Sequence, residues 1–201
     1  MATALSVTFI SEADYLDGEK ISEIRHEYVD GQVYAMAGAH SNHNTIAMNL
    51  AVACGGHLKG KSCRPYMSDM KVRLANGNRY YYPDVLVNCP PIHGYFTESP
   101  ILIVEVLSNA TRRLDETVKR LAYMQIEALE EYVLIEQDFV KIEVIRRSTG
   151  WMPERYYLGD EVILSSIGLT LPVTDIYDGV ENEDMRSWLQ QQAKIINPSA
   201  G

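Results

Sequence analysis

The chain has few cysteines, no long apolar run and fewer basic than acidic residues. Cys54, Cys63 and Cys89 are an odd number without the spacing of a zinc site, so we expect reduced thiols in a cytoplasmic protein. No stretch approaches the roughly 18 apolar residues that a membrane helix needs. Residues 1–10 have neither the basic start nor the apolar core of a signal peptide. We therefore expect a protein without a membrane partner.

The charge balance narrows the class of protein further. The 18 basic and 27 acidic residues give a formal net charge of −9, which argues against a protein that coats nucleic acid by bulk electrostatics. The net charge does not exclude an enzyme with a locally basic surface. The 201 residues, 46% of them hydrophobic, suffice for one full core. We expect a single α/β domain over residues 1–180, then a C-terminal helix and flexible tail over 181–201.

Hydrophobic periodicity and capping residues predict four helices. The first starts after the N-cap Ser11, and the other three run over residues 41–58, 111–128 and 182–195. The second helix has an apolar stripe made of Ile46, Ala47, Leu50, Ala53, Cys54 and Leu58. The third has a stripe made of Leu114, Val118, Leu121, Ala122 and Ile126. We expect both stripes to face the core.

Turn residues between apolar runs predict a mixed sheet. Asp30-Gly31 indicates a hairpin within residues 26–36, and Asn76-Gly77-Asn78 indicates a second one between strands 66–74 and 80–88. The nearly all-apolar run 101–107 is typical of a central strand that is buried on both faces. Further strands are expected over 131–135, 140–146, 151–158 and 161–164. This order predicts a mixed sheet with hairpins, flanked by helices.

Two carboxylates stand out because they interrupt apolar strands. Asp84 follows Pro83 and precedes a run of Val and Leu, and Glu105 lies within the central strand. An ionised carboxylate buried without a partner is costly, so each is explained by water at a strand end, an ion pair or a metal. Together, on consecutive strands, they favour a shared site. Magnesium prefers one or two carboxylates plus waters and phosphate oxygens, and the Val106 carbonyl offers a third protein oxygen.

The helix after Glu105 adds a basic group. Asp115, Lys119 and Tyr123 are spaced four apart and therefore share one face. From there the Lys119 ammonium can reach the strand end that carries Glu105. The alternative is a solvated ion pair between Asp115 and Lys119.

These elements resemble the PD-(D/E)XK nuclease superfamily, and more closely the family of putative restriction endonucleases. The matching stretches are Glu27-Tyr28-Val29-Asp30-Gly31, Met36 followed by His43, Tyr82-Pro83-Asp84-Val85, Val104-Glu105-Val106-Leu107-Ser108, Asp115 with Lys119 and Tyr123, and Glu131-Tyr132. The resemblance covers roughly residues 10–175 and implies a restriction-endonuclease-like core, with Asp84 and Glu105 as metal ligands. The superfamily's usual lysine falls on Leu107, and the closer family implies that Lys119 replaces it. Glu27 matches an additional acid of the superfamily.

Several other residues have two readings. His43, in the first turn of the helix 41–58, is either a group beside the phosphate and the attacking water or a capping, hydrogen-bonded histidine. The spacing of His40 and His43 lacks a third ligand for zinc, and His57 is expected to pack. Tyr80-Tyr81-Tyr82 offers stacking surfaces for bases or ordinary strand residues. Arg112 and Arg113 either contact phosphates or start a solvated helix.

The sequence thus favours metal-dependent phosphodiester hydrolysis of nucleic acid, with DNA as the expected partner. Mg²⁺ or Mn²⁺ would be the cofactor, Asp84, Glu105 and Val106 its ligands, and Lys119, Glu27 and His43 the further catalytic residues. A homodimer is expected because cleavage of both strands needs two active sites. Two alternatives are a nuclease-fold protein that binds nucleic acid or a partner without cutting, and a structural scaffold with internally paired acids.

Overall fold

The main hydrophobic core of the protein packs against a six-stranded mixed sheet. The structure is a computed structural model that describes residues 9–36, 38–74 and 78–196. The strand order is β11-β10-β9-β8-β6-β3. The strands are β3 (Arg64–Met67), β6 (Val85–Asn88), β8 (Pro100–Leu107), β9 (Glu131–Glu136), β10 (Ile142–Arg146) and β11 (Pro153–Tyr156). Only the neighbours β8 and β9 run parallel among the pairs described for this sheet. Strand β8 lies between β6 and β9, which confirms the central strand expected from its apolar run.

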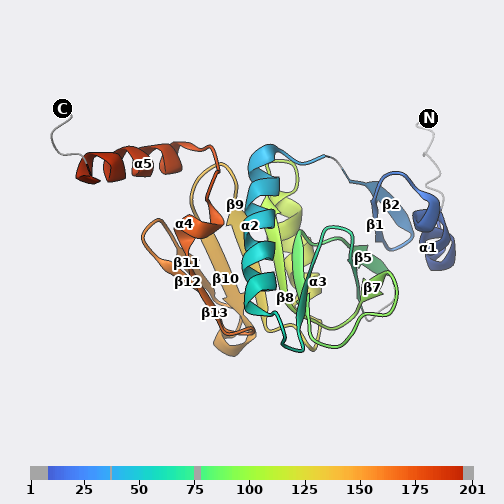
Figure 1. Cartoon of the computed structure of the whole chain (residues 1–201). Helices are drawn as coiled ribbons and strands as arrows, with labels where there is room; N and C mark the ends of the chain where they lie inside the picture. The colour runs from blue at the N-terminus through green and yellow to red at the C-terminus, as the bar shows by residue number, and fades with distance from the viewer. Residues whose placement is uncertain (1–8, 37, 75–77, 197–201) are drawn as a thin grey trace, which may run out of the picture.

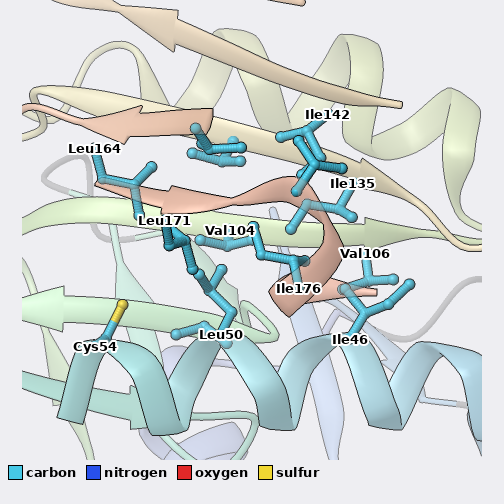
Figure 2. Packing of buried hydrophobic residues seen from close by; sticks show 14 of the residues in the cluster. Ile46, Leu50, Cys54, Val104, Val106, Ile135, Ile142, Leu164, Leu171 and Ile176 are labelled. Atoms are coloured by element: carbon cyan, nitrogen blue, oxygen red, sulfur yellow. The ribbon is translucent and has the colours of Figure 1, made fainter. Parts of the chain in front are cut away.

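The long helix α2 (Ser41–His57) covers one face of this sheet (Figure 1). Ile46, Leu50 and Cys54 point from α2 toward the main sheet, in the same apolar cluster as Val104 and Val106 of β8 (Figure 2). The predicted stripe is therefore confirmed, except that Ala53 is only partly buried. The same core layer includes the two-stranded sheet of β12 (Glu161–Leu164) and β13 (Leu169–Pro172) and the short helix α4 (Val173–Ile176).

The opposite face is covered by a helical segment made of the π-helix η1 (Leu114–Lys119) and α3 (Arg120–Tyr123). Only two of the five residues of the predicted core stripe are buried here. Ala122 and Ile126 are buried, but Leu114, Val118 and Leu121 are exposed. The segment is rotated so that Asp115, Lys119 and Tyr123 face the sheet instead. It also ends at Tyr123, earlier than expected.

A second, five-stranded sheet has the order β2-β1-β5-β4-β7. Its strands are β1 (His26–Val29), β2 (Gln32–Ala35), β4 (Lys71–Arg73), β5 (Arg79–Tyr81) and β7 (Phe96–Thr97). The β1–β2 hairpin turns at Asp30 and Gly31, which both have positive φ, as the Asp-Gly signal predicts. Helix α1 (Glu12–Ile21) packs on this sheet, and the Ser11 side chain accepts a hydrogen bond from the Asp14 amide as its N-cap.

Two predicted strands are each divided between the two sheets. The expected strand 66–74 is interrupted after Met67, and the strand 80–88 is interrupted at Tyr82, Pro83 and Asp84. Proline cannot donate a ladder hydrogen bond, which accounts for the break at Pro83. The break has a consequence for function, because it places Asp84 at the crossing from one sheet to the other.

The expectation of reduced thiols is wrong for two cysteines. Cys63 and Cys89 form a disulfide across the ends of β3 and β6, while Cys54 is a free thiol buried against the main sheet. The paired cysteines are 26 residues apart, so only strand pairing brings them together. The disulfide also removes the support that reduced thiols gave to a cytoplasmic location.

The last helix α5 (Glu183–Ile196) confirms the helix predicted near the C-terminus, and Figure 1 shows it extending away from the sheets. Residues 151–158 and 161–164 were both expected to extend the main sheet. Strand β11 does extend it, but residues 161–164 form β12 of the separate two-stranded sheet. The expected turn at Asn76-Gly77, the tail 197–201 and most of the segment 1–10 lie outside the described residues. Within the described ranges, no helix is both long and apolar enough to cross a bilayer.

Candidate functional site

Asp84 lies where the main sheet meets the second sheet, directly before β6. Val85 pairs with Val104 of β8, so the antiparallel register places Asp84 opposite Glu105. Asp84 Oδ2 accepts a hydrogen bond of 2.7 Å from the Val106 amide. That contact fixes one carboxylate oxygen against β8. The two acids that the sequence selected therefore lie at the same end of the neighbouring strands β6 and β8.

His43 reaches the same point from the first turn of α2. Its Nε2 lies 3.2 Å from Asp84 Oδ2, and both side chains are largely buried. Burial lowers the pKa of His43, but the Asp84 carboxylate and the Val106 backbone outweigh it, so this pKa is raised above its usual value. The capping function belongs to His40, whose ring accepts a hydrogen bond from the Asn42 amide. His43 is thus hydrogen-bonded within the candidate site.

Lys119 comes from the opposite face of the sheet, at the end of η1. Its Nζ lies 3.3 Å from Glu105 Oε1, and the Tyr123 hydroxyl donates a 3.0 Å hydrogen bond to the same oxygen. Leu107, at the position of the superfamily's usual lysine, is buried in the apolar cluster beneath this helix. The ammonium group near Glu105 therefore comes from the helical segment, because the strand has Leu107 where the superfamily has its lysine.

Two more carboxylates surround the Lys119 ammonium. Glu27 Oε1 of β1 lies 2.8 Å from Nζ, and Asp115 Oδ1 lies 3.2 Å from it. Glu27 also accepts a 3.4 Å hydrogen bond from the Tyr82 amide, which ties the second sheet to the site. The Lys119 side chain is only 6% exposed and that of Asp115 only 2%, so a solvated ion pair is the wrong description of this pair.

The site carries more negative than positive charge, and the pKa values reflect this. Burial raises the pKa of Glu105 well above its usual value, with Asp115, Asp84 and Glu27 adding to the increase and Lys119 opposing it. Burial also raises the pKa of Asp115. Burial lowers the pKa of Lys119, but its three acidic neighbours outweigh that effect, so the lysine is held in its charged form.

The donor set fits a hard divalent cation. Within the described residues no hydrogen bond is made to Asp84 Oδ1 or Glu105 Oε2, so each acid has one oxygen held by the protein and one available. The surplus negative charge favours a cation at this point. No group of three His, Cys, Asp or Glu side chains in the described part of the chain is arranged as a ready-made metal cage. Magnesium is commonly bound by only one or two carboxylates, with waters and phosphate oxygens completing its shell.

Sequence reasoning gave Asp115 and Tyr123 no role of their own. Their spacing with Lys119 was the available signal, because four-residue spacing places the three on one face. The three consecutive tyrosines do not have the predicted role in base stacking. Tyr80, Tyr81 and Tyr82 are buried and offer no stacking surface to bases.

Two of the three basic candidates have structural partners. Arg112 is paired with the buried Glu136, and no partner is described for Arg113. His57 Nε2 is 2.9 Å from the Ile167 carbonyl oxygen, in agreement with a packing residue.

Comparisons with known proteins show the family of the chain and its fold. The uncharacterized protein slr1290 of Synechocystis sp. is 35% identical to the chain, over 85% of this chain and 93% of its own length. A second uncharacterized protein of Synechocystis sp., sll1609, is 30% identical, over 71% of this chain and 84% of its own length. A crystal structure described as a putative nuclease belonging to DUF820 from Anabaena variabilis has a TM-score of 0.70 at 17% identity. The match covers 86% of this chain and 99% of that one and shows the fold. Residues 13–174 match the Uma2 family, described as putative restriction endonuclease, and the chain belongs to that family.

Proposed function

We propose that this protein hydrolyses phosphodiester bonds in DNA with the help of Mg²⁺ or Mn²⁺. The observation that carries the proposal is the convergence of Asp84, Glu105 and Lys119 from three separate parts of the chain, with the Lys119 ammonium 3.3 Å from Glu105 Oε1. Membership of the putative restriction endonuclease family supports the same reaction class. So does the likeness in fold to a putative nuclease.

Each residue has a defined task in this proposal. Asp84, Glu105 and the Val106 carbonyl would hold the cation, which would supply an acidified water and neutralise charge on the phosphate. Lys119 orients the attacking water and stabilises negative charge at phosphorus. Glu27 holds the Lys119 ammonium through Oε1. His43 shares a proton with Asp84 through Nε2 and assists proton transfer.

A second candidate is a nuclease-fold protein that binds nucleic acid or a partner without cutting it. The net charge of −9 favours it, because the phosphate backbone is repelled by an acidic surface. Cleavage of both strands of a duplex would require two sites, so the nuclease proposal includes a homodimer. Light scattering coupled to size exclusion would test the dimer.

The decisive assay measures cleavage of plasmid and single-stranded DNA with Mg²⁺, with Mn²⁺ and with EDTA. Asp84→Ala should lower the rate by roughly a hundredfold or more, the loss typical of removing a preorganised charge-stabilising group. Asp69→Ala is the matched control, because it removes the same charge from an exposed ion pair with Arg25. Cleavage by Asp84→Ala at the wild-type rate would refute the proposal, and no cleavage by the wild type would favour the binding protein.

A further inference from the structure

The Lys119 ammonium has three carboxylate partners, and Asp115 is the one to which the proposed mechanism gives no task. Nζ lies 2.8 Å from Glu27 Oε1, 3.2 Å from Asp115 Oδ1 and 3.3 Å from Glu105 Oε1. It also lies 5.5 Å from the centroid of the Tyr81 ring. These groups come from β1, β5, β8 and η1, so the ammonium is held from several sides.

The orientation of η1 buries Asp115 and leaves apolar side chains of the same segment exposed to solvent. This segment is a π-helix, a rare conformation that is frequently found at functional sites. Asp115 is buried, whereas Leu114 and Val118 of the same segment are exposed. Burying a carboxylate instead of leucine or valine is unfavourable unless the carboxylate is paired. The pairing with Lys119 therefore explains why the segment has this orientation.

Glu105 has two competing cationic partners in the proposed mechanism. Its Oε1 already interacts with the Lys119 ammonium, and the same carboxylate is the proposed ligand of the divalent cation. An ammonium group bound to Glu105 alone would neutralise that carboxylate and weaken its attraction for a second cation. Glu27 and Asp115 prevent this because they share the ammonium.

We propose that Asp115, together with Glu27, is a positioning residue that holds the Lys119 ammonium partly away from Glu105 and so keeps Glu105 available to the divalent cation. The inference rests on the proposed metal site but not on DNA cleavage. It predicts that the effect of replacing Asp115 on metal affinity depends on whether Lys119 is present. A direct metal ligand or a remote charge at Asp115 would not depend on Lys119 in this way.

The test is a double-mutant cycle read by calorimetric Mn²⁺ binding without DNA. Asp115→Asn should weaken Mn²⁺ binding by about tenfold or more, the factor typical of redistributing a hydrogen bond between charged groups. In the Lys119→Met background the same change should alter the affinity by less than about threefold. Glu116→Gln is the matched control, since it removes the same charge from the adjacent, exposed position. It should leave the affinity nearly unchanged.

Glu27→Gln gives a second, independent variant should Asp115→Asn fail to fold, which thermal unfolding will detect. It should weaken Mn²⁺ binding in the wild type and lose most of its effect in Lys119→Met. Equal losses in both backgrounds would overturn the proposal, as would unchanged affinity or a wild type that binds no Mn²⁺. Coupled Mn²⁺ binding without any DNA cleavage would leave the positioning role intact and refute the nuclease activity instead.

Discussion

Replacing Lys119 by methionine leaves three buried carboxylates without their shared cation. The Lys119 side chain is 6% exposed, and Glu27, Asp115 and Glu105 lie within 3.3 Å of its Nζ. Removing one partner of a buried ion pair costs about 3–5 kcal/mol, whereas an exposed pair contributes less than about 1 kcal/mol. We therefore expect the free energy of unfolding of the metal-free protein to fall by about 3–5 kcal/mol at pH 8.

The loss should depend on pH and on metal. Glu105 already has a raised pKa, and without the ammonium it will take up a proton more readily, so the loss at pH 5.5 should be smaller than at pH 8. A divalent cation supplies the missing charge. At a concentration of 100 times its Kd, a ligand that binds only the folded state adds about 2.7 kcal/mol, so Mn²⁺ should restore much of the stability.

Urea denaturation of both proteins in EDTA and in Mn²⁺ measures these effects, and Lys20→Met is the matched control on an exposed pair with Asp17. A loss under about 1 kcal/mol at pH 8 would contradict the buried cluster. Turnover is a separate readout, and Lys119→Met should lower it by roughly a hundredfold or more while Mn²⁺ binding survives or tightens. Equal cleavage rates would remove Lys119 from the mechanism.

Two further predictions concern pH and the disulfide. Because burial raises the pKa of Glu105 in the folded state, its contribution to stability is greatest when it is protonated and is lost as pH rises from about 4.5 through the raised folded-state pKa. The unfolding free energy of the wild type in EDTA should therefore fall more steeply between pH 5 and pH 8 than that of Glu105→Gln, and parallel profiles would contradict this. Cys63→Ser opens a cross-link between cysteines 26 residues apart and should lower stability by about 3.5 kcal/mol under non-reducing conditions. In excess reductant the difference between the two proteins should largely disappear, and its persistence would show that the serine acts through packing.

The sequence by itself determined the local elements and the two central acids. Asp30-Gly31 can take positive φ and therefore defines a hairpin, and the stripe from Ile46 to Cys54 defines the buried face of α2. The apolar run around Glu105 predicts a strand buried on both faces, and a carboxylate within such a run indicates a site. These features depend on spacing along the chain, so they can be read without knowing what packs against them.

Only the tertiary structure decided which face of the segment 114–123 is buried. Two stripes overlap there, and the apolar one that includes Leu114 and Val118 is the more hydrophobic. The stripe with Asp115 and Lys119 faces inward because Glu27 and Glu105, from strands of two different sheets, complete its ion cluster. The free energy of that cluster depends on groups distant in sequence, and so does the pairing of Cys63 with Cys89. Local periodicity cannot report either, because both depend on which strands become neighbours.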